Sequence, residues 1–260
     1  MSYLDDLFSL DSKVAVTIGA GGVLGGAMAS ALGRAGARVA VLDLNGDAAQ
    51  VQADAIYGAA GVDAIGVGVD ATSESGLEHA LELIVEKWGR VDILLNAPGI
   101  NSGTPFFEIT RDEWDKVLAV NLTSYFLASQ IFGGRMVEQD EGGSIINISS
   151  ASSGPPLSKV FAYSITKAGI NNMTQFLARE WAPHKVRVNA VAPGFFPAEQ
   201  NRKLLTEERT ASIMGHTPMA RFGEPDELAG AVVWLASDNA SGFVTGSLVR
   251  VDGGFTAMTI

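Results

Sequence analysis

Residues 13–26 read KVAVTIGAGGVLGG, a short apolar run that leads directly into a cluster of glycines. The run 13–18 has almost no polar interruption, as expected of a strand that is buried on both faces of a sheet. An Ala-rich stretch then continues to Arg34, and a second apolar run, 37–42, closes on Asp43. The stretch therefore predicts a strand, a glycine turn, a helix and a second strand that ends in an acidic residue.

This succession is typical of a turn that binds a dinucleotide. Glycines let the chain turn tightly and let a ligand approach the backbone, and the N-terminus of the following helix accepts a pyrophosphate. The strict G-x-G-x-x-G spacing is absent, so the prediction depends on the surrounding strand–turn–helix–strand order. The residues of the turn that we expect to contact the cofactor are Gly19, Gly22, Val23, Leu24 and Gly25.

Asp43 bears on which dinucleotide binds. A carboxylate at the end of the second strand can accept hydrogen bonds from both ribose hydroxyls of NAD. The same charge would repel the 2′-phosphate of NADP, and the glycine turn contains no Arg or Lys to offset it. The sequence therefore predicts NAD as the cofactor.

The alternation of strands and helices continues along the chain. Further apolar runs predict strands at 64–69, 91–95, 144–148, 186–191 and 247–251, and helical patterns predict helices at 73–88, 110–137, 161–181 and 224–236. Such alternation predicts an α/β fold, a Rossmann-like doubly wound parallel sheet of about seven strands with helices on both faces. We expect one domain over 1–260, with ligands at the carboxyl ends of the strands.

Tyr163 and Lys167 are four residues apart in the helical pattern 161–181, so they share one face of that helix. An ammonium beside a phenol favours the phenolate, which predicts a lowered pKa for Tyr163. A phenol tuned in this way can exchange a proton with an alcohol near neutral pH. The run 144–148 leads to Ser150, which adds a hydroxyl near the start of the helix. An ordinary aromatic–cation pair has the same spacing, and the neighbouring cofactor motifs favour the chemical interpretation.

The composition excludes several classes of protein. The chain has 260 residues and no cysteine, which rules out disulfides and thiolate metal sites. Its net charge of −11 argues against nucleic acid or an anionic membrane as a partner. We find no signal peptide and no apolar run that could span a bilayer, and so expect a cytoplasmic location. His79, His184 and His216 lack ligand spacing, so we expect no metal.

Taken in order, these motifs resemble those of the short-chain dehydrogenase/reductase family over essentially the whole chain. The resemblance rests on the glycine turn, Asp70, the turn 96–99, Asn121, Ser150, Tyr163, Lys167, the turn 193–194 and the stretch 251–254. Residues 195–202 and 221–225 most resemble the subgroup of D-mannonate oxidoreductases. The chain departs from the family pattern at Ile18, Val23, Ala97–Pro98 and Ala198.

The resemblance implies a role for each matching residue. Tyr163 would be the general acid/base, Lys167 would lower its pKa and bind the nicotinamide ribose, Ser150 would orient the substrate oxygen, and Asn121 would anchor a water in the proton relay. Further cofactor contacts would come from Asp70, Ala71, Asn96, Ala97, Pro98, Tyr163, Lys167, Pro193, Gly194 and Phe196. The family also implies a homotetramer in which the helices from Arg111 and from Phe161 pair.

The segment 197–217 follows the sixth strand, and we expect it to close over the substrate as a mobile lid. Arg202 in this segment, beside Lys203, and Lys159 on the opposite wall would bind the carboxylate of a sugar acid. Gln200 would bind its hydroxyls, and Ser150 and Tyr163 would contact the reacting oxygen.

The sequence thus predicts an NAD(H)-dependent oxidoreductase that interconverts a secondary alcohol and a ketone on a sugar acid or sugar-like substrate, such as the mannonate/fructuronate pair. Three alternatives remain open: a neutral sugar or polyol dehydrogenase, a 3-oxoacyl reductase, and a regulator that binds NAD without turnover. An acyl carrier is acidic, as is this chain, which weakens the second alternative. A regulator would need none of Asn121, Ser150, Tyr163 and Lys167.

Overall fold

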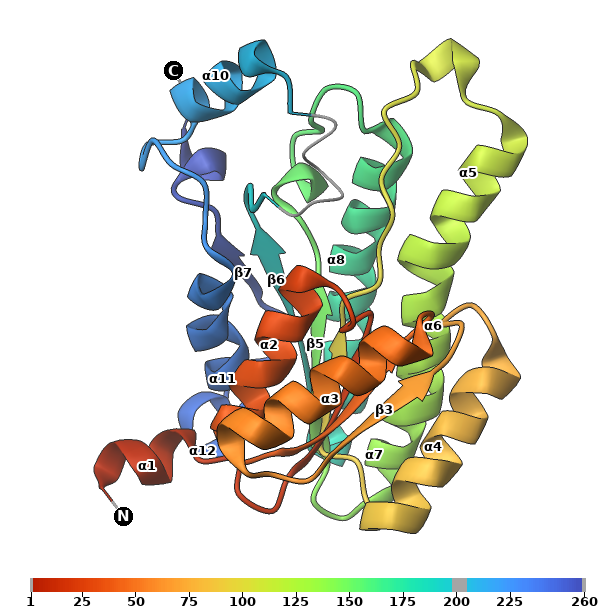
Figure 1. Cartoon of the computed structure of the whole chain (residues 1–260), viewed down its shortest axis with the longest axis vertical. Helices are drawn as coiled ribbons and strands as arrows, with labels where there is room; N and C mark the ends of the chain where they lie inside the picture. The colour runs from red at the N-terminus through yellow and green to blue at the C-terminus, as the bar shows by residue number, and fades with distance from the viewer. Residues whose placement is uncertain (1, 198–204, 259–260) are drawn as a thin grey trace.

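Seven parallel strands form one twisted sheet in the order β3-β2-β1-β4-β5-β6-β7 in the computed structural model, which describes residues 2–197 and 205–258 (Figure 1). The strands are β1 (Val14–Ile18), β2 (Arg38–Asp43), β3 (Ala64–Gly68), β4 (Ile93–Asn96), β5 (Gly143–Ile148), β6 (Val186–Pro193) and β7 (Leu248–Val251). Each strand begins and ends within two residues of the apolar run that predicted it. The single doubly wound α/β domain is therefore confirmed.

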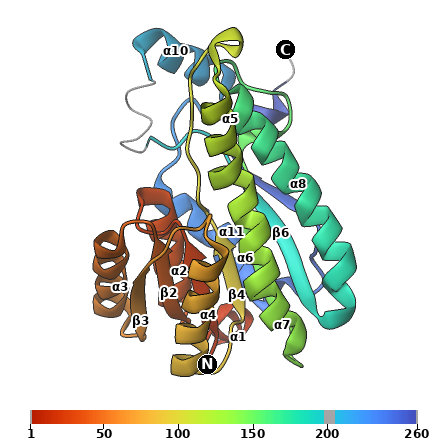
Figure 2. The same ribbon diagram turned by 90° about the vertical axis from the view of Figure 1, so that its right-hand side faces the viewer.

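Helices cover both faces of the sheet (Figures 1 and 2). One face carries α2 (Val23–Arg34), α3 (Gly46–Ala60) and α11 (Ala229–Ala236), and the other carries α4 (Glu74–Trp88), α5 (Arg111–Leu118), α6 (Ser124–Ala128), α7 (Gly134–Glu138) and α8 (Phe161–Trp181). The remaining helices are α1 (Tyr3–Phe8), α10 (Glu207–His216) and α12 (Asp238–Ser241). The buried apolar side chains lie between these helices and the sheet, which leaves the two ends of the strands open for polar groups.

Among the described residues, the short helices α1 and α12 and the longer helices α3 and α10 were not predicted from the sequence. Helix α3 fills the connection between β2 and β3, where Asn45 caps its N-terminus by accepting from two backbone amides and Gly61 ends it with φ +69°. Helix α10 lies within the segment 197–217, for which no helix was predicted. Thr206, whose hydroxyl accepts from the amide of Arg209, supplies a helix start that the polar composition concealed.

The long helix predicted over 110–137 is present as the continuous column α5–α6–α7, with two π-helical turns, Ala119–Thr123 and Ser129–Gly133. Thr110 caps it, as predicted, by accepting from the amide of Glu113. By length and composition alone, Arg111–Glu138 could cross a membrane, contrary to the expectation from the sequence. The column packs against the sheet and α8, however, and its buried residues belong to the core, which accounts for its apolar character (Figure 2).

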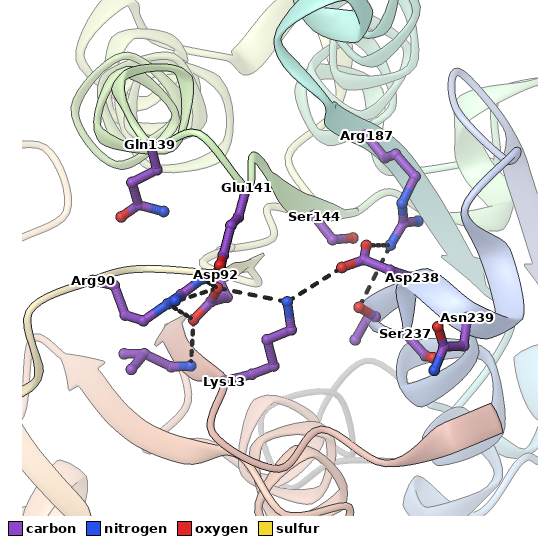
Figure 3. A network of polar contacts seen from close by, with 12 residues as sticks. Lys13, Arg90, Asp92, Gln139, Glu141, Ser144, Arg187, Ser237, Asp238 and Asn239 are labelled. Carbon is purple, nitrogen blue, oxygen red and sulfur yellow. Dashed lines mark hydrogen bonds and ion pairs between the residues drawn. The ribbon is translucent and has the colours of Figure 1, made fainter. Parts of the chain in front are cut away.

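At the amino end of the sheet, charged side chains pair with one another (Figure 3). The carboxylate of Asp92, which is 3% exposed, accepts a 2.9 Å hydrogen bond from the backbone amide of Val14 and is held by the guanidinium of Arg90. Arg90 also pairs with Glu141, in the loop before β5. These contacts join the starts of β1, β4 and β5.

A second group of charges continues the network toward β6. The Arg187 guanidinium is buried and donates 2.9 Å to Asp238 and 2.8 Å to the carbonyl of Leu235. The Lys13 ammonium lies 3.3 Å from a carboxylate oxygen of Asp238, which links this group to Asp92 (Figure 3). The amino end of the sheet is therefore stabilised by paired charges.

Candidate active site

The glycine turn after β1 lies at the carboxyl end of the sheet and packs against the turn after β4. Gly19 has φ +74°, and a Cβ at this position would come within 2.8 Å of the nitrogen of Pro98. A Cβ at Gly25 would collide with the carbonyl oxygen of Gly19. Only glycine at these two positions allows α2 to begin so close to β1.

The first turn of α2 is free to receive an anion. Gly22 precedes the helix and provides no side-chain cap, so the first amides of α2 have no side-chain acceptor from that position. Val23 is 53% exposed, and it forms the first turn together with Leu24. Uncapped amides at a helix N-terminus suit a pyrophosphate, so the predicted loop residues fit the phosphates of a dinucleotide.

Asp43 ends β2 next to this turn and is fixed by the backbone. One carboxylate oxygen accepts a 3.0 Å hydrogen bond from the amide of Gly21, and the other accepts one of 3.0 Å from the amide of Asn45. Each oxygen keeps acceptor capacity for a further donor. The carboxylate is thus fixed beside the glycine turn, where it can accept hydrogen bonds from the two hydroxyls of a ribose.

The other predicted cofactor residues lie at or after the carboxyl ends of β3, β4 and β6. Asp70 and Ala71 follow β3, and the Asp70 carboxylate accepts from Thr72. Asn96 ends β4, is fully buried and donates 2.9 Å to Asn147 on β5, while the amide of Ala97 donates to Ile18. Pro193 ends β6, the amide of Gly194 donates 2.9 Å to Val251, and Phe196 is buried against Gly223. These residues line the same edge as the glycine turn.

Asn121 lies in the π-helical turn Ala119–Thr123 and is fully buried. Its amide group accepts 2.8 Å from the nitrogen of Ile100 and donates 2.8 Å to the carbonyl of the same residue. A Cβ at Gly99 would stand 3.8 Å from both the Asn121 oxygen and the Lys167 ammonium. The turn after β4 therefore brings Asn121 and Lys167 together, and it touches the glycine turn through Pro98.

Ser150, Tyr163 and Lys167 meet where β5 ends and α8 begins. Ser150 follows β5, and its hydroxyl accepts 3.1 Å hydrogen bonds from the amide and the hydroxyl of Ser152 and lies near enough to the phenol of Tyr163 to act on its pKa. Lys167 is 3% exposed, and its ammonium lies 5.5 Å from the centroid of the Tyr163 ring. Helix α8 runs from Phe161 to Trp181, as predicted, and presents both side chains on one face. The structure therefore assembles the four predicted catalytic residues at one place.

The predicted lowering of the Tyr163 pKa by Lys167 is wrong. Burial raises the pKa of Tyr163, although the contact with Ser150 acts in the opposite direction. Burial also lowers the pKa of Lys167 to about 7. Both groups are buried away from water, which disfavours the charged form of each. Two donors of the Lys167 ammonium are bound by acceptors other than Tyr163, at 2.7 Å by the carbonyl of Ile148 and at 3.2 Å by the hydroxyl of Tyr125.

Tyr125 is the site residue that the sequence interpretation missed. It is fully buried on α6, and its hydroxyl lies 3.1 Å from the carbonyl of Pro98 and 3.0 Å from that of Ile148. The same hydroxyl accepts from Lys167, so one side chain links the turn after β4, the end of β5 and the lysine. Tyr125 stands four residues after Asn121, a spacing that could have marked it as a neighbour.

The predicted substrate residues are only partly described. Lys159 is exposed and has φ +66°, in the loop before α8. Gln200, Arg202 and Lys203 lie outside the described residues, as does Ala198. Within residues 2–197 and 205–258, no three His, Asp or Glu side chains form a group that could hold a metal ion.

The family model described as "Enoyl-(Acyl carrier protein) reductase" matches residues 19–256, nearly the whole chain. The chain belongs to the short-chain dehydrogenase/reductase family. The family resemblance of the sequence is thus confirmed, and with it an oxidoreductase that acts on CH–OH groups and binds a nicotinamide cofactor.

Relatives from several bacteria match over nearly their full length. The chain is 41% identical to the uncharacterized oxidoreductase UxuB of Bacillus subtilis, with 96% of each chain covered. It is 36% identical to D-threitol dehydrogenase of Mycolicibacterium smegmatis, covering 96% of this chain and 95% of the relative. It is also 36% identical to 5-keto-D-gluconate 5-reductase of Escherichia coli, covering 96% of this chain and 98% of the relative.

Solved structures of similar proteins contain either form of the cofactor. A gluconate 5-dehydrogenase from Burkholderia cenocepacia, in complex with NADP and tartrate, superposes with a TM-score of 0.94 at 31% identity and covers 99% of this chain and 100% of its own. A protein of Haemophilus influenza described as a D-mannonate oxidoreductase, with bound NAD, has a TM-score of 0.91 at 33% identity and covers 98% of this chain and 99% of its own. The choice between NAD and NADP therefore depends on this chain's own residues.

Proposed function

We propose that this protein is an NAD(H)-dependent oxidoreductase that interconverts a secondary alcohol and a ketone on a sugar acid. The observation that carries the proposal is the contact group formed by Ser150, Tyr163 and Lys167 at the edge that also holds the glycine turn and Asp43. The similarity to 5-keto-D-gluconate 5-reductase and gluconate 5-dehydrogenase supports the substrate class. A D-mannonate or D-fructuronate substrate is one member of that class.

The proposed chemistry assigns one task to each side chain. Tyr163 removes the proton from the substrate hydroxyl during oxidation and returns it during reduction, and Ser150 holds the same oxygen in place. Lys167 has three donors, of which two are bound by Ile148 and Tyr125, so the third is available to a ribose hydroxyl. Asn121 fixes the turn after β4 through Ile100 and would hold a relay water. The bound nicotinamide supplies or accepts the hydride.

The preference for NAD rests on Asp43. Its carboxylate is fixed by two backbone amides and would accept the ribose hydroxyls of NAD, whereas a 2′-phosphate would meet a negative charge. The test compares kcat/KM with NAD and NADP in the wild type and in Asp43→Ser. We expect the wild type to prefer NAD and the variant to shift toward NADP. Equal kcat/KM with both cofactors in the wild type would contradict the preference.

A neutral polyol is the second candidate substrate, because D-threitol dehydrogenase is as similar to this chain as the gluconate enzyme is. Reduction of a 3-oxoacyl group on an acyl carrier is less favoured by the net charge of −11, since a carrier is itself acidic. The deciding assay follows reduced cofactor with D-gluconate, D-mannonate, their alditols and an acyl thioester. A wild type that prefers an alditol would exclude the sugar acid, and no turnover of any of them would favour a regulator.

We further propose that the protein assembles as a homotetramer through α5–α6 and α8. Phe126 and Phe176 are more than half exposed, and Phe161 and Ile165 are exposed as well, which gives these helices an apolar surface. The segment 197–217 remains the proposed substrate lid. Sedimentation of the purified protein tests the assembly, and a monomer would contradict it.

A further inference from the structure

A cavity of about 380 Å³ lies between α10 and the loop that precedes α8. Its walls include Ser158 from that loop, Phe195 from the segment after β6, and Phe255. Figure 1 places α10 above the carboxyl ends of β6 and β7. Ser158 stands five residues before Tyr163, and Phe195 directly follows Gly194, so two walls of the cavity continue along the chain into the proposed site. Its volume is within the roughly 300–1,000 Å³ common for small-molecule pockets.

One face of α10 supplies the polar wall of this cavity. Arg209, Ser212 and His216 line it, and their spacing of three and four residues puts them on a single helix face. The start of the helix fixes this orientation, because the Thr206 hydroxyl accepts from the amide of Arg209. The ring of His216 packs edge-on against Phe255, with ring centroids 4.7 Å apart, which fixes the C-terminal end of this helix face.

Arg209 carries a charge for which the described residues offer no acidic partner. The one hydrogen bond that its side chain makes within them runs 3.3 Å to the backbone carbonyl of Ser158. By contrast, the guanidinium groups of Arg90, Arg187 and Arg221 each pair with a carboxylate. None of the described residues that line the cavity is acidic, in a chain of net charge −11. A half-buried guanidinium with unused donors, facing a cavity without acids, is suited to a planar anion.

We propose that this cavity is the subsite for the substrate's carboxylate, with Arg209 as its ligand and Ser212 and His216 as partners for neighbouring hydroxyls. The inference deepens the proposed sugar-acid function and rests on it. It replaces Lys159, which is exposed and does not line the cavity, as the main cationic contact on the described part of the chain. Because the carboxylate is remote from the reacting carbon, Arg209 acts in binding and not in the proton transfer.

The test is a comparison of Arg209→Gln with wild type on D-gluconate and D-mannonate and on the matching alditols. Losing one charge-assisted contact should raise KM for the preferred acid by roughly 10–150-fold while kcat changes little. The alditols should be unaffected. Titration of the NADH-loaded proteins with the same acid should show the same loss in binding. Arg209→Lys should recover part of the affinity, because it restores the charge without the planar fork.

Arg38→Gln is the matched control, since Arg38 also donates to a single backbone carbonyl, that of Ser12, but at the amino end of the sheet. It removes the same net charge and should leave both KM values unchanged. If the wild type prefers the acid and Arg209→Gln keeps that preference, the subsite is wrong and the sugar-acid function stands. If the wild type itself prefers the alditol, the sugar-acid function and the subsite both fail.

Discussion

At the amino end of the sheet, buried Asp92 is held by Arg90, and the hydrogen bond between them raises the pKa of the guanidinium (Figure 3). At the carboxyl end, Lys167 is just as buried, yet no carboxylate of residues 2–197 and 205–258 pairs with it, and burial lowers its pKa to about 7. Removing one partner of a buried charge pair strongly lowers the free energy of unfolding. An unpaired amine with a pKa near neutrality can instead assist proton transfer. The contrast indicates that one end of the sheet maintains the fold and the other performs the chemistry.

Tyr163→Phe should show the largest effect, and only at the carboxyl end. General acid–base catalysis contributes roughly 10²–10⁴-fold, so kcat should fall by about that factor. The midpoint of urea unfolding and the affinity for NADH should stay close to wild type, since the ring remains in place. Steady-state rates, urea titration and NADH titration measure the three quantities. A kcat near that of the wild type would refute the role of Tyr163.

Asp92→Ala should produce the converse result. Removing one partner of a buried charge pair costs about 3–5 kcal/mol of unfolding free energy, because Arg90 and the amide of Val14 lose their acceptor. The kcat of the folded protein should remain near wild type. Glu180→Ala is the control, because it breaks a pair with Arg179 whose side chains are exposed, and such pairs contribute about 0–1 kcal/mol. Equal destabilisation by both changes would contradict the role of Asp92.

Lys167→Met should remove the pH dependence of stability that arises from the carboxyl end of the sheet. The folded protein releases the Lys167 proton near pH 7, whereas the unfolded chain keeps it to about pH 10.4. Between these values the unfolded state binds more protons, so stability rises with pH, and below about pH 7 the full penalty of the buried charge applies. The unfolding free energy of wild type relative to Lys167→Met should therefore increase from pH 7 to pH 10. Parallel pH curves from urea titration would show that burial of the amine carries no such penalty.

Tyr125→Phe is the most local change, because it removes one hydroxyl and keeps the buried ring. Without this acceptor the Lys167 ammonium is less favoured and less firmly held. We expect kcat for alcohol oxidation to fall about tenfold, since a bond to a charged group contributes roughly 1.5–3 kcal/mol. Tyr57→Phe, at an exposed position on α3, is the control. A loss of stability with an unchanged kcat would mean that Tyr125 serves packing alone.

Most of the fold could be predicted because strands buried on both faces are largely apolar, as in 13–18. Helix α3 escaped prediction because its buried stripe, Ala49, Ala53 and Ile56, consists mostly of small residues, and α10 because Thr206 was its main sign among polar neighbours. Asn121, Ser150, Tyr163 and Lys167 could be found from their spacing and family resemblance.

The pKa directions and Arg209 could not be found in this way. Whether an ammonium lowers a neighbouring pKa depends on the burial of both groups and on the acceptors that hold it, such as Tyr125 and Ile148, and the sequence records neither. The position of Arg209 against Ser158 depends on the path of two loops that are distant in sequence.

The double variant Tyr163→Phe with Asp92→Ala tests most directly whether the two ends act separately. The four residues of β4 alone span about 13 Å, so Asp92 and the Tyr163 site are far enough apart for additive effects. Measured together, kcat should equal that of Tyr163→Phe, and the unfolding free energy should equal that of Asp92→Ala to within about 0.5 kcal/mol. A further fall in kcat, or a coupling of 1 kcal/mol or more, would contradict the separation of chemistry from stability.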